Sequence, residues 1–272
     1  MGRTITLASG KGGVGKTTIT ANLGIALAKA GFRVCLVDAD IAMANLSLLL
    51  GMQSSPITLH DVLLGEAAIN DAIYDGPDGV KFIPSGLSLE NYRRVDSERL
   101  HGVIEAIKDN FDFVLIDAPA GIEKNVLAAI SAAEEVLLIV TPDSPSIADV
   151  LKTRLTAQRL NVRPIGFVTN FVRHEKGEIS SEEIMKMLEC PLYGEIPYDT
   201  EVRRSFMQEK VNPVILRMPN CSAAAAILKL ASKLTGKEVT VESKQRQSVI
   251  QTLLNTIGSL FKSKKQKVPV NE

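Results

Sequence analysis

A glycine-rich loop near the start of the chain constrains its fold more than any other feature. The pattern G-x-x-x-x-G-K-[ST] is matched in full by Gly10, Lys11, Gly12, Gly13, Val14, Gly15, Lys16 and Thr17, with Thr18 following. The loop lies between an apolar run, 4–8, and a helical pattern, 16–30, as a phosphate-binding loop requires. Its N–H groups can turn inward around phosphate oxygens, and the helix adds the positive end of its dipole. We expect Lys16 to reach the β- and γ-phosphates and the Thr17 hydroxyl to ligate Mg²⁺.

Short apolar runs alternate with helical patterns along most of the chain. The runs expected to form strands are 4–8, 34–37, 80–83, 113–116, 136–140, 165–169 and 192–196. The expected helices are roughly 16–30, 97–109, 124–133, 146–160, 180–188 and 222–234. This alternation predicts a doubly wound, mostly parallel α/β sheet with helices on both faces. Ligands of such sheets bind at the carboxyl ends of the strands, so functional residues are expected just after each strand.

Carboxylates occupy two of these positions. Asp38 and Asp40 follow the second predicted strand. Asp117 follows the four apolar residues of the fourth predicted strand, as the aspartate of a Walker B motif does. We expect Asp38 and Asp117 to belong to the Mg²⁺ network. A helix cap is the alternative interpretation for one of the first two.

The loop also contains a second lysine, Lys11, which an ordinary phosphate-binding loop does not need. Lys-Gly-Gly-Val-Gly-Lys-Thr resembles the deviant Walker A motif of the family that includes MinD, the ParA partition ATPases and the nitrogenase iron protein. The resemblance implies that Lys11 crosses a dimer interface to the partner's nucleotide, and that Asp40 orients the attacking water. A solvated loop charge is the alternative for Lys11. The stretch Asp117-Ala118-Pro119-Ala120-Gly121 resembles the second switch of MinD in particular, which implies that the Gly121 N–H contacts the γ-phosphate.

Recognition of the base is less clear from the sequence. Asn170 is expected just after a strand, and Pro197 lies in a similar position after the next one. In the family an Asn and the backbone near a Pro hold adenine, so the resemblance assigns both residues to the base. A plain turn is the alternative for Asn170. The stretch Asn170–Arg173 lacks the Asn-Lys-x-Asp pattern of signalling GTPases, which disfavours guanine.

The C-terminal part of the chain differs from the rest in charge and pattern. From 236 to 272 there are seven Lys/Arg and three Asp/Glu, a net charge of +4, which leaves −4 for residues 1–235 because the whole chain is neutral. We divide the chain into an ATPase domain (1–235), a polar linker (236–247) and an amphipathic helix with a basic tail (248–272). The predicted membrane-contacting residues are Val249, Ile250, Leu253, Leu254, Ile257, Leu260, Phe261, Lys262, Lys264 and Lys265. Such a helix is typical of a membrane-surface segment, although a helix docked on the body fits the pattern alone.

The resemblance covers essentially the whole chain, and the second switch together with the terminal helix favours MinD. It implies an ATP- and Mg²⁺-dependent ATPase that dimerises with ATP, binds an anionic membrane and positions the division machinery, with protein regulators whose identity is unknown. We expect it in the cytoplasm, on the inner face of the cell membrane. A regulator of flagellar number and a DNA-partition ATPase are the alternatives, although an acidic body disfavours nucleic acid. Three cysteines without a C-x-x-C pair argue against a disulfide framework and an iron–sulfur scaffold.

Overall fold

The computed structural model describes residues 2–40, 45–52, 55–86, 97–121, 123–207 and 212–240. The chain divides into a body, Met1–Val239, and a C-terminal unit, Thr240–Glu272. The predicted membrane helix, with all its residues from Val249 to Lys265, lies outside the described residues. The fold and the site below therefore concern the body.

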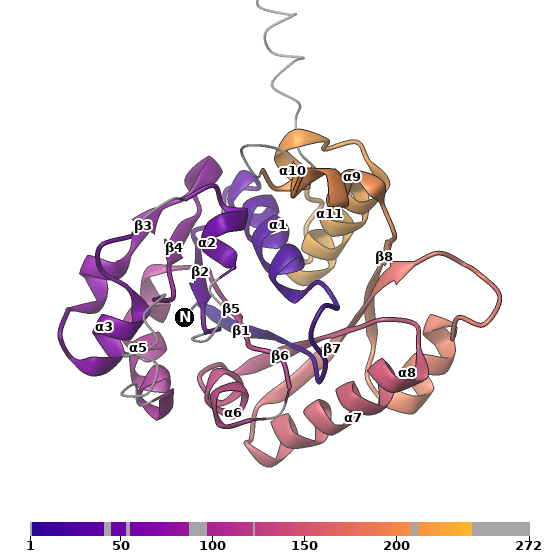
Figure 1. Ribbon diagram of the computed structural model, residues 1–272, viewed down its shortest axis with the longest axis horizontal. Coiled ribbons are helices and arrows are strands. Elements are labelled where there is room, and N and C mark those ends of the chain that lie inside the picture. The colour runs from indigo at the N-terminus through magenta and orange to yellow at the C-terminus, as the bar shows by residue number, and fades with distance from the viewer. Residues whose placement is uncertain are drawn as a thin grey trace, which may run out of the picture. The chain divides into compact units, whose positions relative to one another are not determined.

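An eight-stranded sheet forms the centre of the body, in the order β3-β4-β2-β5-β1-β6-β7-β8 (Figure 1). Its strands are β1 (Arg3–Ala8), β2 (Val34–Asp38), β3 (Tyr74–Asp75), β4 (Lys81–Ile83), β5 (Phe113–Asp117), β6 (Glu135–Val140), β7 (Arg163–Val172) and β8 (Leu192–Pro197). All neighbours pair in parallel except β3 and β4. Strands β2, β5 and β6 are buried along their whole length, which explains their nearly continuous apolar sequence. The predicted doubly wound, mostly parallel fold is confirmed.

Helices cover both faces of the sheet (Figure 1). They are α1 (Lys16–Lys29), α2 (Leu46–Leu49), α3 (Leu59–Leu64), α5 (Leu100–Ile107), α6 (Lys124–Ser131), α7 (Ser144–Arg159), α8 (Ser181–Leu188), α9 (Thr200–Ser205), α10 (Val214–Arg217) and α11 (Ser222–Thr235). Short 3₁₀ turns span Ile69–Ala72, Pro77–Gly79, Ser97–Arg99 and Lys108–Asn110. Helices α1 and α11 pack on each other and cover one face, whereas α6 and α7 pack on β1, β6 and β7.

The ends of several elements have a local cause. Asp143 caps α7, because its carboxylate accepts the Ser146 N–H at 3.0 Å, so the helix begins at Ser144. Ser180 and Glu183 form a capping box at α8. The sequence predicted a strand over 165–169, and its predicted end at Thr169 is wrong. Strand β7 continues to Val172, and the positive φ of Phe171 (61°) accompanies a register shift against β8 between Asn170 and Val172.

The body ends shortly after α11. Gly236 adopts φ 68° beyond the helix, and the Val239 N–H donates to the Ser232 hydroxyl at 2.8 Å. Val239 is buried, so the chain stays packed on the body up to this residue. Cys35, Cys190 and Cys221 are free thiols. Within the described ranges, no helix combines the length and apolar character needed to cross a membrane.

Candidate nucleotide-binding site

The glycine-rich loop connects β1, in the middle of the sheet, to α1. Gly13 and Gly15 adopt φ values of 78° and 93°, in the left-handed region that favours glycine. Close packing constrains two of the glycines. A Cβ on Gly15 would lie 2.3 Å from Nδ2 of Asn170, and one on Gly10 would lie 2.5 Å from the carbonyl oxygen of Asp149 in α7. The loop is therefore wedged between β7 and α7, and glycine is needed where neighbouring atoms leave no room.

Lys16 is the first residue of α1, and its side chain is turned into the body. The residue is 7% exposed, and its Nζ donates to the hydroxyl of Ser9 at 3.1 Å. Burial lowers the pKa of Lys16, and the negative charges of Asp117 and Asp40 oppose that shift. Lys11, by contrast, is exposed. The two lysines thus occupy different environments, one buried and one exposed.

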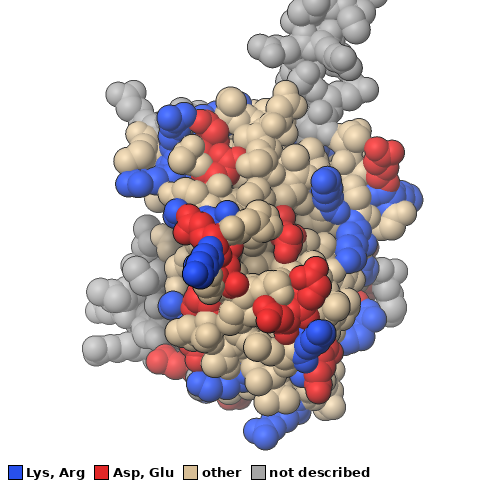
Figure 2. Space-filling model, turned by 90° about the vertical axis from the view of Figure 1, so that its right-hand side faces the viewer, with Lys and Arg blue, Asp and Glu red and all other residues tan. Residues whose placement is uncertain are grey.

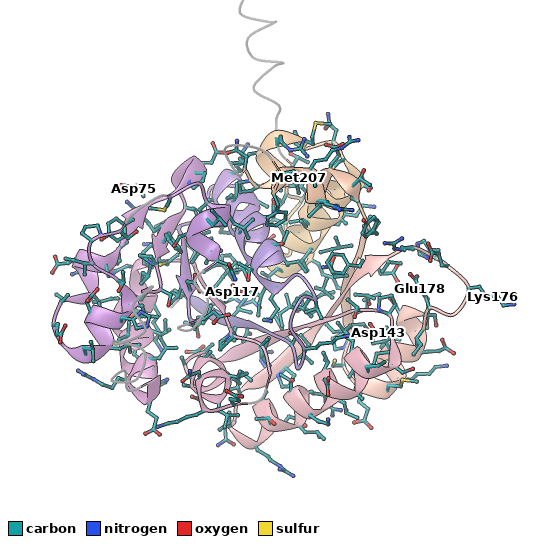
Figure 3. All side chains as sticks on the ribbon, viewed as in Figure 1. Asp75, Asp117, Asp143, Lys176, Glu178 and Met207 are labelled. Carbon is teal, nitrogen blue, oxygen red and sulfur yellow. The ribbon has the colours of Figure 1, made fainter. Side chains whose placement is uncertain are left out.

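Two buried carboxylates lie at the carboxyl ends of adjacent strands, and one of them, Asp117, is close enough to Lys16 for their charges to interact. Asp38 and Asp117 end the adjacent strands β2 and β5 and are partners in the register. Burial raises the pKa of Asp117 to about 6, although hydrogen bonds from the Thr17 and Thr20 hydroxyls and the charge of Lys16 oppose it. Asp117 lies near the centre of the body (Figure 3).

Asp38 is held by backbone groups. Burial and the charge of Asp117 raise the pKa of Asp38, while the N–H groups of Leu46 and Asp40 each donate to its carboxylate at 3.2 Å. Leu46 is the first residue of α2, so Asp38 accepts an N–H from the start of this helix, as a capping side chain does. Two buried carboxylates and the Thr17 hydroxyl form a set of oxygen donors that suits Mg²⁺, which would also offset the cost of burying two like charges.

The segment after β5 lies against the loop. A Cβ on Gly12 would lie 3.5 Å from the Cβ of Ala120, so the two segments lie close together with room for a side chain between them. Gly121 adopts φ 97°, a conformation that side chains disfavour. The structure therefore brings Gly121 to the same edge as the loop. Asp40 lies close to Lys16 and Asp117, because its charge affects the pKa of both residues. It therefore lies at the same edge of the sheet as the loop.

A largely apolar cavity of about 280 Å³ opens beside the start of α1. Its lining comes from α1, the ends of β7 and β8, α9 and α11: Thr18, Ile19, Asn170, Phe171, Ile196, Pro197, Tyr198, Asp199, Val202, Arg203, Phe206, Ala223 and Ile227. Asn170 is buried, and its Nδ2 donates to the carbonyl of Val14 at 2.7 Å. An amide anchored in this way keeps an acceptor oxygen, which suits the exocyclic amine of adenine. Flat apolar walls suit a purine ring.

Several residues of this cavity were not predicted. Tyr198 meets the ring of Phe171 edge-on at 6.4 Å, and Arg173, which lies outside the lining, stacks its guanidinium over the Tyr198 ring at 3.8 Å from the centroid. Asp199 joins α9 to α11, because its carboxylate accepts from Glu201 N–H, Ser222 Oγ–H and Ala223 N–H. The only available sequence signal was the position of Tyr198 and Asp199 directly after Pro197. Val202 lies in α9 and Phe206 directly follows it, and this helix is too short to predict.

A second cavity, of about 440 Å³, lies near the carboxyl end of β7 and the start of α8. Its charged lining includes Glu175, Glu178, Glu182 and Glu195. Glu178 and Lys176 lie toward the right-hand side of Figure 3, and the right-hand face shown in Figure 2 carries acidic side chains near its middle. Carboxylates repel phosphate, so this second cavity does not suit a nucleotide.

Comparison with known proteins agrees with this geometry. Residues 5–212 match the CobQ/CobB/MinD/ParA nucleotide binding domain. An uncharacterised ATP-binding protein of Methanocaldococcus jannaschii is 45% identical over 243 residues, 89% of this chain and 91% of that protein. The cell division ATPase MinD of Pyrococcus furiosus is similar in structure, with a TM-score of 0.83, 39% identity and coverage of 87% and 99% of the two chains. The septum site-determining protein MinD of Pyrococcus horikoshii, solved with Mg-ADP, has a TM-score of 0.83, 36% identity and coverage of 89% and 100%.

Proposed function

Because the chain belongs to the CobQ/CobB/MinD/ParA nucleotide-binding family, we propose that it is a MinD-like, ATP-dependent dimeric switch on the membrane. It hydrolyses ATP and positions the cell-division machinery. The ATPase proposal rests mainly on Lys16 at the N-terminus of α1. This lysine is buried, its ammonium donates to the Ser9 hydroxyl, and the charge of Asp117 acts on it. A lysine in this position suits the β- and γ-phosphates, whose charge it would offset.

Each predicted site residue has a role in this proposal. The loop residues from Gly10 to Thr18 bind the phosphates, and Thr17, Asp38 and Asp117 hold Mg²⁺, which offsets charge on the phosphate oxygens. Asp40 orients the attacking water, and Lys11 from the partner subunit adds a second positive charge. Gly121 donates its N–H to the γ-phosphate, and Asn170 and Pro197 contact adenine.

The proposed ATP-dependent membrane binding follows from the difference in membrane affinity between one helix and two. A single amphipathic helix resembles a single acyl chain in having marginal affinity for a membrane, roughly 10⁴ M⁻¹. Joining two helices in one dimer raises the effective affinity by on the order of 10² to 10⁴. A monomer would then stay mostly in solution, and an ATP-bound dimer would stay mostly on the membrane. Hydrolysis would release it, so the protein would act peripherally on the cytoplasmic face, under the control of protein regulators.

The test is turnover in an Asp40→Ala variant. We expect wild type to hydrolyse ATP with Mg²⁺ and to lose activity with EDTA. Asp40→Ala should bind ATP and dimerise but fail to turn over, because the water loses its orienting carboxylate. Asp75→Ala is the matched control, since Asp75 is an exposed carboxylate on β3 at the edge of the sheet. Turnover at the wild-type rate in Asp40→Ala would remove this residue from the mechanism, with Asp38 the next candidate.

A further inference from the structure

The residue just before the phosphate-binding motif links both of its lysines. Ser9 follows β1 and is fully buried, and the pattern G-x-x-x-x-G-K-[ST] assigns it no role. Its hydroxyl donates to the carbonyl oxygen of Lys11 at 2.7 Å. The Ser9 hydroxyl oxygen in turn accepts a hydrogen bond from Nζ of Lys16 at 3.1 Å. We propose that Ser9 is a positioning residue for phosphate binding. It sets the direction of the Gly12 N–H and the position of the Lys16 ammonium. This inference rests on the proposed function of the loop.

The first effect acts through one peptide group. The bond between Lys11 and Gly12 is trans, so its carbonyl and its N–H point in opposite directions. Ser9 draws the carbonyl toward the buried end of β1, which turns the Gly12 N–H away from the body. Gly12 itself is exposed, which leaves room for a phosphate to approach this N–H.

The second effect concerns Lys16. A hydroxyl has a single proton, and Ser9 uses it on Lys11, so its lone pairs are what face the ammonium. The negative charges of Asp117 and Asp40 also attract this ammonium. Without Ser9, Lys16 would move toward these carboxylates, which are the groups that the proposal assigns to Mg²⁺ and water. Ser9 therefore keeps the lysine on the loop side, available to the phosphates.

Calorimetry with Mg-ADP and with a non-hydrolysable ATP analogue tests the proposal. Ser9→Ala should weaken binding by about 10-fold, the size expected for one hydrogen bond to a charged group. Ser9→Cys keeps the shape of the side chain, in a slightly larger size, with a much weaker donor and should behave like Ser9→Ala. Ser9→Thr keeps the hydroxyl and should recover most of the affinity. Ser205→Ala is the control, a buried serine hydroxyl that bonds the Glu201 carbonyl and Arg217 in α9 and α10.

Amide resonances distinguish positioning from simple loss of stability. In wild type the Gly12 N–H resonance should move strongly on adding Mg-ADP, and in Ser9→Ala that movement should shrink while the melting temperature stays near the wild-type value. Unchanged affinity and an unchanged Gly12 shift in Ser9→Ala would overturn the inference. So would equal losses in Ser9→Ala and Ser9→Thr at an unchanged melting temperature. Failure of wild type itself to bind nucleotide would instead overturn the proposed function.

Discussion

Asp117 and Asp38 place two carboxylates in the interior, side by side on adjacent strands. Burial raises the pKa of both, so keeping Asp117 charged at neutral pH destabilises the nucleotide-free protein. Asp117→Asn removes that charge and keeps an oxygen that can accept from Thr20. We expect this variant to be more stable without nucleotide, on the order of 2 kcal/mol.

The same variant should lose the stabilisation that Mg-ATP gives to wild type, because a Mg²⁺ carboxylate is missing. Thermal melts with and without Mg-ATP measure both effects. Asp112→Asn is the control, since Asp112 is partly exposed and paired with Arg33 away from the site. A lower melting temperature for nucleotide-free Asp117→Asn would show that the carboxylate stabilises the fold, contrary to this account.

Substitutions of Lys11 and Lys16 should have different effects on ATP binding and on dimerisation. Lys16→Ala should weaken ATP binding by about 100-fold, because the phosphates lose a charged hydrogen-bond donor within the same subunit. Lys11→Ala should retain most of the affinity and lose ATP-dependent dimerisation, which light scattering measures. Lys176→Ala is the matched control, an exposed lysine in the loop at the right of Figure 3. A normal ATP-dependent dimer from Lys11→Ala would contradict its role across the interface.

At the scale of elements, Asp199 joins two of the helices that line the apolar cavity beside α1. Its carboxylate caps α9 through Glu201 and also accepts from Ala223 in the first turn of α11. Partial burial opposes its charge, but hydrogen bonds from the Ser222 hydroxyl and from the N–H groups of Glu201 and Ala223 outweigh it and lower the pKa to about 2. Asp199→Ala should cost about 2 kcal/mol at pH 7, since each helix cap contributes about 1 kcal/mol.

The sign of the pH dependence follows from that lowered pKa. The carboxylate stabilises the folded state above its unfolded pKa of 3.8, and this contribution disappears as the pH falls through about 2. The difference in stability between wild type and Asp199→Ala should therefore be constant near neutral pH and narrow below about pH 4. Chemical denaturation at several pH values measures it. A difference that stays constant down to pH 2 would mean that the charge of Asp199 does not contribute.

Long, buried elements were predictable from sequence, and short ones were not. The central strands follow from apolar runs flanked by glycine or aspartate, and α1 and α11 follow from their length and alanine-rich composition. Helices α2, α9 and α10 have four to six residues, too few for a periodic pattern. The antiparallel strand β3 has only two residues.

Among the site residues, too, some were predictable from the sequence and others were not. The loop and Asp117 could be found from spacing, because their chemistry requires fixed residue types beside a strand. Ser9 and Tyr198 could not, since their contacts come from tertiary packing rather than from any local pattern. The strand position of Asn170 was missed for a related reason: the positive φ of Phe171 falls in a strand, where no sequence rule predicts it.

At the scale of the whole molecule, the proposed switch depends on joining two weak membrane contacts. We predict that wild type sediments with anionic vesicles in ATP and remains mostly in solution in ADP. The apolar face of the predicted helix supplies most of the affinity, and Lys262, Lys264 and Lys265 add about 1 kcal/mol each near an anionic surface. Binding should therefore weaken as the salt concentration rises.

A pair of substitutions in the tail tests the predicted face. Leu254→Glu places a charge in the apolar stripe and should abolish sedimentation, while ATP binding stays at the wild-type level because the site is built from the body. Asn255→Glu adds the same charge on the polar face and should reduce sedimentation only slightly. If Leu254→Glu instead lowers the melting temperature and binds vesicles normally, the helix packs on protein rather than lipid. Equal binding of wild type in ATP and ADP would make the tail a constitutive anchor, because a nucleotide switch requires the dimer to hold the membrane far more tightly than the monomer.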